Sequence, residues 1–371
     1  MNFEIILSDT TEALPLVYES DIVSLETRDN LCNEKGKIDS VYKEWDKVKR
    51  SIHDHEYIYT SSSLHKNIAQ VNPVSRSYFK MKEMLQEFKI DVKDIHVTCL
   101  AEAPGGFIQA LLEESIQVVH GITLVSEDSR VPYWNRCLKN DSRVRFQFGK
   151  SKDGDLYNYS NILSYIETIG KHTMDLITGD GGFDNSDDYN RQEINSLRLI
   201  YSEIYVALHL QKQGGTFICK VFDTFEKETI LLLYILWFSY ETVSLYKPHI
   251  SRVSNSEKYV ICRGYKGYKI EHMNHLTHHF TDCKISFGIQ PEFVTWIHGF
   301  NQNYSRIQIQ SIHRGLQYIK QKHFHNVPTQ FQIDIAIEWC KKYNIPINQD
   351  CHYIKSYIKS YTKSYIKSYT K

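Results

Sequence analysis

The stretch from Leu100 to Ser115, LAEAPGGFIQALLEES, constrains the fold more than any other part of the chain. It follows a β-rich run at 95–100 and passes into a segment whose apolar residues recur with helical spacing, so it predicts a strand, a glycine turn and a helix start. Pro104 can fix the entry to the helix, and Gly105 and Gly106 lack a Cβ, so a ligand could approach the backbone near the helix N-terminus. The dinucleotide fingerprint GxGxxG is absent, and a plain tight turn is the alternative.

Downstream of this turn, β-rich runs alternate with segments of helical period. The expected strands are 120–125, 143–148, 174–178, 216–220, 241–246 and 258–263, and the expected helices include 194–208, stopped by Gly214 and Gly215, and 229–240. Alternation of this kind predicts an α/β fold with a mostly parallel, doubly wound sheet and helices on both faces. The last two strands are joined without a helix, so we expect them to pair antiparallel at one edge.

Composition excludes several classes of protein. Lys+Arg and Asp+Glu are both 44 in 371 residues, so any charge that binds RNA must be local. No apolar run approaches the roughly 18 residues of a membrane span, and the N-terminus lacks a basic leader, so we expect a soluble intracellular protein with no membrane partner. The eight cysteines show no CxxC spacing, which favours reduced thiols. A metal site on the histidines at 272, 275, 278 and 279 is an alternative, although no cysteine or carboxylate completes the set.

Together with the alternating strands and helices, the remaining regions predict four parts of the chain. Residues 1–30 show no clear period, apart from a short strand at 3–7, whereas apolar residues between Ile38 and Ile52 recur as on one face of a helix. Beyond residue 265, helices are expected at 293–300, 309–319 and 331–343. The tail repeats Tyr, Lys and Ser with five lysines and no acid, which indicates either an RNA contact or an idle repeat. The parts are an N-terminal extension with an amphipathic helix (1–60), the α/β domain (61–268), a helical C-terminal region (269–350) and the low-complexity basic tail (351–371).

Three polar residues follow predicted strands: Asp180, Lys220 and Glu257. In an open α/β sheet the ligand crevice lies at the carboxyl ends of the strands. An acid and a lysine that each close a buried strand are costly to bury unpaired, so packing explains them poorly. They form either a structural ion pair or a site in which a lysine with a shifted pKa accepts a proton near neutral pH.

Four motifs stand in order along the chain: SRSYFK at 75–80, APGGF at 103–107, DGGF at 180–183 and NSE at 255–257. Together they resemble the FtsJ-type RNA ribose 2′-O-methyltransferases over roughly residues 71 to 266. Within that family, the last two motifs are similar to those of the mRNA cap enzymes, the Adrift type. The resemblance implies a Rossmann-like class I methyltransferase fold and a tetrad of Lys80, Asp180, Lys220 and Glu257.

The resemblance also implies S-adenosyl-L-methionine as cofactor. Its binding loop would be Ala103, Pro104, Gly105, Gly106 and Phe107, with Asp180 beside it. The acid that holds the cofactor ribose in the family has no unambiguous match here. Glu127, Asp128 and Asp155 are the candidates.

The activity implied is methyl transfer to a ribose 2′-hydroxyl, on the first or second transcribed nucleotide of capped mRNA. In this reading Lys220 accepts or steers the proton, Asp180 and Glu257 orient it, Lys80 holds the ribose or its phosphate, and no metal takes part. Arg76, Lys247 and Arg252 would be phosphate contacts or solvated surface charges. Ribosomal or transfer RNA is an alternative substrate, and a catalytically idle module that binds RNA is an alternative function. Other capping or transcription components would be further partners, in the cytoplasm, the nucleus or a virus particle.

Overall fold

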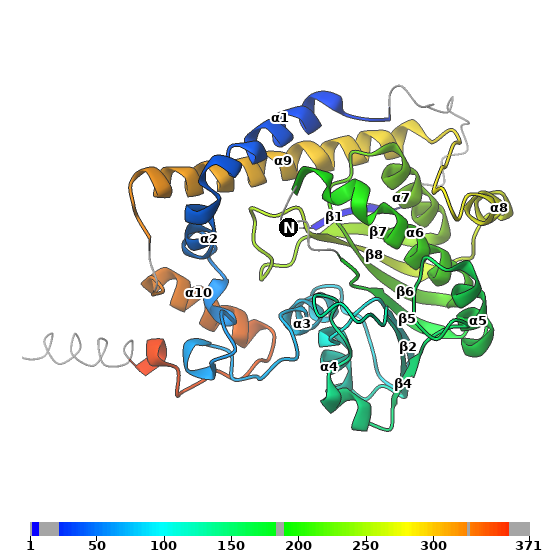
Figure 1. Cartoon of the computed structure of the whole chain (residues 1–371), viewed down its shortest axis with the longest axis horizontal. Coiled ribbons are helices and arrows are strands. Elements are labelled where there is room, and N and C mark those ends of the chain that lie inside the picture. The colour runs from blue at the N-terminus through cyan, green and yellow to red at the C-terminus, as the bar shows by residue number, and fades with distance from the viewer. Residues whose placement is uncertain (1, 7–21, 183–188, 325–326, 356–371) are drawn as a thin grey trace, which may run out of the picture.

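A computed structural model describes residues 2–6, 22–182, 189–324 and 327–355 (Figure 1). Phe183 of the third motif and residues 356–371 of the expected tail lie outside the described residues. The chain remains packed up to Lys355, because Cys351 and Ile354 are buried in the second hydrophobic core.

Within the described ranges, eight strands form one sheet in the order β1-β7-β8-β6-β5-β2-β3-β4. Strands β4, β3, β2, β5 and β6 are parallel, whereas β8 pairs antiparallel with β6 and β7, and β7 with β1. The mostly parallel sheet with an antiparallel edge is therefore confirmed, and β1 extends that edge. The strands are β1 Asn2–Ile6, β2 His96–Leu100, β3 Val118–Ile122, β4 Val144–Gln147, β5 Met174–Gly179, β6 Gln211–Val221, β7 Tyr240–Tyr246 and β8 Lys258–Tyr265.

Helices cover both faces of the sheet, as predicted (Figure 1). One core packs α5, α6, α7 and the start of α9 against the sheet, and the other packs α3, α4 and α10 against the opposite face. A third, small cluster joins α2 to α9 through Trp45, Val48 and Ile312. The helices are α1 Leu25–Gly36, α2 Tyr42–Ser51, α3 Ser77–Glu87, α4 Gly106–Leu112, α5 Tyr159–Ile169, α6 Gln192–Leu210, α7 Lys227–Ser239, α8 Ile270–His278, α9 Pro291–Lys320 and α10 Gln330–Lys342.

The turn after β2 has the predicted strand, turn and helix order. The chain leaves β2 through Ala101, whose φ of 52° is left-handed, and the peptide bond before Pro104 is cis. Gly105 has a φ of 105°, which side chains other than glycine rarely adopt, and α4 begins at the next residue. The apolar face of α4 then packs into the second core.

Helix α1 was not expected from the sequence, because its buried face is not an apolar stripe. The buried positions are Leu31 and Lys35. The Lys35 ammonium lies 2.5 Å from Asp223, and Lys258 approaches the same carboxylate to 3.6 Å. When a helix buries a charged residue against a partner distant in sequence, its sequence does not show apolar residues at helical spacing.

Helix α6 and helix α9 differ from the prediction. Helix α6 ends at Leu210, before the glycines at 214 and 215, because buried Gln211 starts β6 and donates its amide to the backbone carbonyls of β5 at 2.9 and 3.1 Å. The two helical segments expected at 293–300 and 309–319 form the single helix α9, which has 30 residues. No helix in the described part of the chain is both long and apolar enough to cross a membrane.

Candidate active site

The four tetrad residues meet at the carboxyl edge of the parallel strands. Lys80 comes from α3, Asp180 follows β5, Lys220 lies near the end of β6, and Glu257 directly precedes β8. The Lys220 ammonium donates to the Asp180 carbonyl oxygen at 2.7 Å and lies 3.3 Å from its carboxylate. The Lys80 ammonium lies 2.7 and 2.8 Å from the two carboxylate oxygens of Glu257. The side chains are only 11–16% exposed, so the two ion pairs sit largely out of water.

Two hydroxyl groups that the sequence analysis missed hold the carboxylates. The Tyr259 hydroxyl donates to Asp180 at 2.7 Å, and the Ser251 hydroxyl donates to Glu257 at 2.7 Å. Tyr259 stands opposite Lys220 in the antiparallel register of β6 and β8. A prediction of that register would have placed Tyr259 at the site. Ser251 lies in a loop without a periodic pattern, so no such signal was present for it.

The charges of the tetrad set the protonation of its members. Burial acts to raise the pKa of Glu257, but the positive charges of Lys80 and Lys220 outweigh it, and the pKa is lowered below its usual range. Burial acts to lower the pKa of Lys220, but the charges of Asp180 and Glu257 raise it above its usual range. Lys220 is therefore an ammonium at neutral pH, and its pKa is shifted away from neutral pH and not toward it.

Two further carboxyl groups are buried behind the tetrad. Glu203 on α6 accepts the N–H of Gly181 at 3.3 Å and the thiol of Cys219 at 3.2 Å, and burial raises its pKa to about 8. Glu102, in the turn after β2, accepts the hydroxyl of Thr178, and burial raises its pKa well above the usual range. Its second oxygen, Oε2, is buried without a hydrogen-bond partner among the described atoms. A buried polar atom without a partner is rare in folded proteins.

The glycines of the turn allow close packing within the protein. A Cβ on Gly106 would lie 2.2 Å from Ser77 Oγ and 2.3 Å from Ser75 Oγ, so this glycine lets α4 approach the segment that starts α3. A Cβ on Gly105 would lie 2.3 Å from Leu138, so this glycine lets the turn approach the segment after β3.

The three candidate acids for the cofactor ribose lie in different settings. Glu127 and Asp128 are exposed, and Asp128 is bound to a neighbouring arginine at 2.6 Å. Asp155 is half-buried and accepts the N–H of Tyr157 at 2.8 Å. Its loop runs beside the chain that leaves β3, where the N–H of Val125 donates to the carbonyl two residues before Asp155 at 2.6 Å. Asp155 is thus the one half-buried acid of the three, in a loop held beside the chain that leaves β3.

The cations expected at phosphates are mostly engaged within the protein. Lys247 is buried, and its ammonium donates to the backbone carbonyls of Asn255 and Glu257 at 2.8 and 2.7 Å and to the Asn255 side chain at 2.7 Å. Burial, with the nearby charge of Lys258, lowers its pKa well below the usual range. Lys247 is therefore neither a phosphate contact nor a solvated charge. It holds the loop that contains Glu257.

The two arginines are also bound within the protein. Arg76 donates to the carbonyl oxygen of Ile250 at 2.8 Å, and Arg252 pairs with Glu56 at 2.9 Å. Both contacts join the loop after β7 to residues that precede α3. In the described part of the chain, no group of three His, Cys, Asp or Glu side chains is placed to hold a metal ion, and His272 stacks on Phe287 instead.

The sequence is similar to those of several known proteins. The family model for FtsJ-like methyltransferases matches residues 73–265. Cap-specific mRNA (nucleoside-2′-O-)-methyltransferase 1A of Caenorhabditis briggsae is 38% identical over 170 residues, 43% of this chain and 19% of that protein. Cap-specific mRNA (nucleoside-2′-O-)-methyltransferase 1 of Trypanosoma cruzi is 34% identical over 179 residues, 47% of this chain and 49% of that protein. A second C. briggsae protein, named inactive cap-specific mRNA (nucleoside-2′-O-)-methyltransferase 1B, is 37% identical over 170 residues, 43% of this chain and 20% of that protein. The chain spans less than half the length of these relatives.

Proposed function

Because the chain belongs to the FtsJ-like methyltransferase family, we propose that it transfers a methyl group to a ribose 2′-hydroxyl of RNA, on the first or second transcribed nucleotide of capped mRNA. The proposal rests on the contacts of Lys220 with Asp180 and of Lys80 with Glu257. These contacts bring together four residues from separate parts of the fold at one site. The names of the relatives support capped mRNA as the substrate. Other capping or transcription components are further proposed partners.

Methyltransferases of this family use S-adenosyl-L-methionine, which supplies a methyl group already activated on a sulfonium. We assign its binding to the turn at Ala103–Phe107, together with Asp180 and an acid at Asp155 or Glu127. The fit is supported by Glu102 in the same turn, because its second carboxyl oxygen is a buried polar atom without a hydrogen-bond partner among the described atoms, and the cofactor is rich in polar groups.

The residues of the tetrad then divide the remaining tasks. A ribose hydroxyl is a weak nucleophile, so the protein must align it and help to remove its proton. Lys220 takes that role, and it must first lose its own proton, so the rate rises with pH. Asp180 and Glu257 hold the ammonium and set its charge, while Lys80 fixes Glu257 and faces the ribose or its phosphate.

The flanking parts complete the proposal. Residues 61–268 carry the reaction, and the extension at 1–60 and the helical region at 269–350 shape the contact with RNA. The basic tail at 351–371 adds a salt-sensitive attraction for phosphate.

A methyl-transfer assay with radiolabelled cofactor tests the proposal on capped and uncapped RNA of identical sequence. Transfer to the capped RNA alone is the expected result. Equal transfer to both RNAs would contradict the proposed requirement for a cap but would still support 2′-O-methylation of RNA. RNA binding without any transfer would favour the idle module, for which the inactive C. briggsae relative is a precedent.

A further inference from the structure

Glu83 is a buried carboxylate to which the proposed reaction gives no role. It lies on α3, three residues after Lys80, and its side chain is fully buried. Residues three apart on a helix are neighbours on its surface, so Glu83 lies on the same side of α3 as Lys80. Burial acts to raise the pKa of Glu83, but the hydrogen bond and charge of His249 outweigh it, and the pKa is lowered. A charged carboxylate is costly to bury unless donors surround it, so the elements that supply these donors are tied to α3.

Within the described part of the chain, hydrogen-bonding groups from β7, the loop after it and α10 surround this carboxylate. The Tyr246 hydroxyl, at the end of β7, donates to Oε1 at 2.5 Å. The backbone N–H and the ring Nδ1 of His249, in the loop after β7, lie 2.6 and 2.8 Å from the same oxygen. The indole N–H of Trp339, on α10, donates to Oε2 at 2.9 Å. Glu83 therefore joins α3 to both the loop and α10.

The loop that Glu83 holds also carries the partner of Lys80. The loop ends with Glu257, whose carboxylate pairs with the Lys80 ammonium at 2.7 Å. Ser251, two residues after His249, donates its hydroxyl to Glu257 at 2.7 Å. Helix α3 and the loop are thus joined at two places, by the ion pair of the tetrad and by Glu83. Two attachments fix the orientation of a helix and a loop, whereas one attachment leaves them free to rotate.

Helix α10 lies outside the segment that matches the family, yet it supplies the donor for one oxygen of Glu83. Trp339 is buried, and its ring packs edge-on against Phe79 of α3 with the ring centroids 5.9 Å apart. Without the indole N–H, Oε2 of Glu83 would have no partner in the described part of the chain. A buried acceptor that loses its donor is destabilised, so the carboxylate or α3 would shift toward another donor.

We propose that Glu83 is a positioning residue, which holds α3 and the loop after β7 in the orientation that pairs Lys80 with Glu257. The N–H of Trp339 fixes the carboxylate of Glu83 from α10. The inference rests on the proposed function, since it concerns the geometry of the same site. It makes a helix outside residues 73–265 part of the structure that aligns the tetrad.

Trp339→Phe tests the proposal in the full chain, because it keeps an aromatic ring and removes the N–H that binds Glu83. Single-turnover methyl transfer at saturating capped RNA and cofactor should fall about 10- to 100-fold, the scale of a small misplacement of reacting groups. Cofactor affinity, measured by calorimetry, should stay within about twofold of the wild type. Trp237→Phe is the matched control, because Trp237 is also buried in a helix and its indole N–H has no partner among the described atoms.

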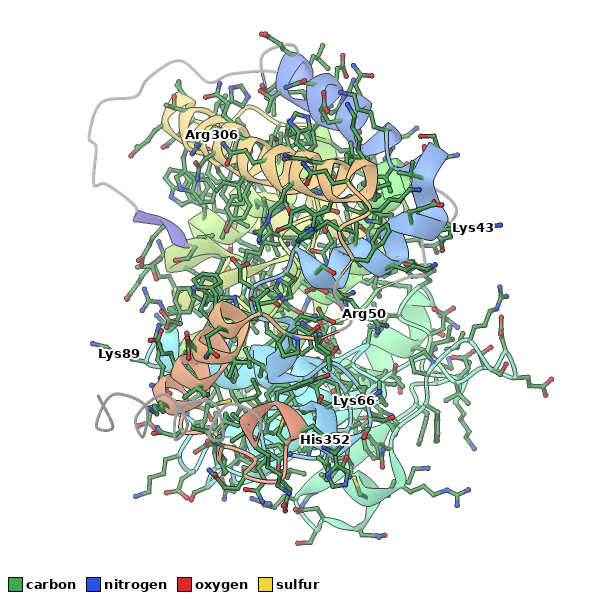
Figure 2. The ribbon with its side chains drawn as sticks, turned by 90° about the vertical axis from the view of Figure 1, so that its left-hand side faces the viewer. Lys43, Arg50, Lys66, Lys89, Arg306 and His352 are labelled. Atoms are coloured by element: carbon green, nitrogen blue, oxygen red, sulfur yellow. The ribbon has the colours of Figure 1, made fainter. Side chains whose placement is uncertain are left out.

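Acylation of Lys80 by an N-hydroxysuccinimide ester, followed by mass spectrometry, examines the site without methyl transfer. Lys80 is paired with Glu257 and is only 11% exposed. Lys89 extends into solvent just after α3 and serves as the reference within the same chain (Figure 2). Trp339→Phe should raise the acylation of Lys80 relative to Lys89 several-fold, whereas Trp237→Phe should leave the ratio unchanged.

His249→Ala is a second variant, at a position whose side chain is 40% exposed and is therefore easier to replace than a core residue. It removes the ring nitrogen from Glu83 and keeps the backbone N–H, so the transfer rate should again fall. His249→Asn should restore the rate to within about threefold of the wild type, because the asparagine amide nitrogen is as many bonds from Cα as Nδ1 and also donates.

The outcomes separate positioning from the reaction itself. If the wild type transfers methyl groups and Trp339→Phe matches Trp237→Phe in rate and in acylation, Glu83 has no positioning role and the proposed function stands. An equal fall in rate in both variants would assign the effect to packing and overturn the inference. If the wild type transfers to no RNA, the proposed function is wrong. The acylation ratio of Trp339→Phe then decides the inference, which a rise supports and an unchanged ratio refutes.

Discussion

Replacing Lys220 by alanine should stop methyl transfer without dismantling the site. Asp180 keeps the hydrogen bond from Tyr259, and Glu257 keeps its ion pair with Lys80. The loss is therefore confined to the ammonium that lies 2.7 Å from the Asp180 carbonyl. Removing a positioned acid or base lowers turnover by about 10²- to 10⁴-fold, which is about 2.7–5.4 kcal/mol of transition-state stabilisation.

The assay is single-turnover transfer of a radiolabelled methyl group at saturating RNA, with cofactor binding followed by calorimetry. Lys220→Arg should fail as well, because a guanidinium keeps its proton. Lys212→Ala is the matched control, since Lys212 is exposed at the other end of the same strand and pairs with Asp175. Turnover of Lys220→Ala within about threefold of the control would refute the assigned role.

The pH profile gives a second test of the same residue. The negative charge of Glu257 raises the pKa of Lys220, so Glu257→Gln should lower that pKa. The rise in rate with pH should then move to lower pH, whatever happens to the maximal rate. Because the tetrad titrates as a coupled group, the midpoint belongs to the cluster. A midpoint that moves to higher pH would contradict the arrangement of charges described above.

Three further outcomes follow from the packing. Gly106→Ala should destabilise the protein by about 1–3 kcal/mol in urea unfolding, because its Cβ would lie 2.2 Å from Ser77 Oγ; an unchanged midpoint would show that the contact relaxes freely. The pKa of Glu203 is raised from 4.5 to about 8, so between these pH values the folded state holds a proton that the unfolded state has released. Stability should fall as pH rises across that window, by at most about 1.4 kcal/mol per pH unit, and thermal unfolding of Glu203→Gln should show a flatter dependence than the wild type. A protein that ends at Lys355, without residues 356–371, should keep its turnover and bind RNA more weakly at low salt, and identical salt titrations would show that the repeat is inert.

Two members of the tetrad could be predicted from their positions alone because they break a simple rule, whereas the resemblance to the family supplied Lys80. Asp180 and Lys220 stand at the ends of apolar strands, where an unpaired charge is costly, and parallel strands bring their carboxyl ends to one edge. Tyr259 could not be found in the same way, because a buried tyrosine in an apolar strand is ordinary until the register places it opposite Lys220. The spacing of apolar residues reports only which positions bury apolar side chains. It therefore located most strands, but it missed α1, whose buried positions include a lysine.

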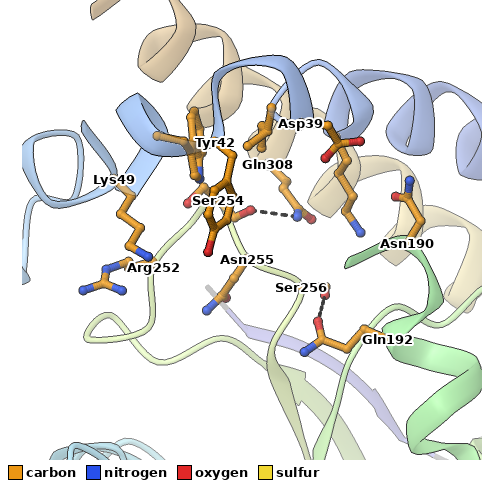
Figure 3. A pocket seen from close by; sticks show the side chains of 13 residues that line it. Asp39, Tyr42, Lys49, Asn190, Gln192, Arg252, Ser254, Asn255, Ser256 and Gln308 are labelled. Carbon is orange, nitrogen blue, oxygen red and sulfur yellow. Dashed lines mark hydrogen bonds between the residues drawn. The ribbon is translucent and has the colours of Figure 1, made fainter. Parts of the chain in front are cut away.

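A pocket of about 520 Å³ could not be predicted from the sequence (Figure 3). Its walls include Tyr42 from α2, Asn255 from the loop before β8 and Gln308 from α9, which lie far apart along the chain. The packing at Gly105 and Gly106 could not be predicted for a related reason. A glycine pair indicates that some atoms come close to the backbone, but only the fold identifies the protein atoms on the Cβ side of each glycine.

The buried charges around Asp223 limit how far the chain could be shortened. Lys35 reaches Asp223 from the N-terminal extension, while Lys258 reaches it from β8, so one carboxylate joins the flank to the sheet. A chain cut to residues 73–265 would keep Asp223 and Lys258 but lose Lys35, and removing one partner from a buried charge cluster costs about 3–5 kcal/mol. That is a large share of the roughly 5–15 kcal/mol that holds a typical domain folded. The extension is thus a structural component of the fold, and in a shortened chain Asp223 would depend on Lys258 alone for an ion pair.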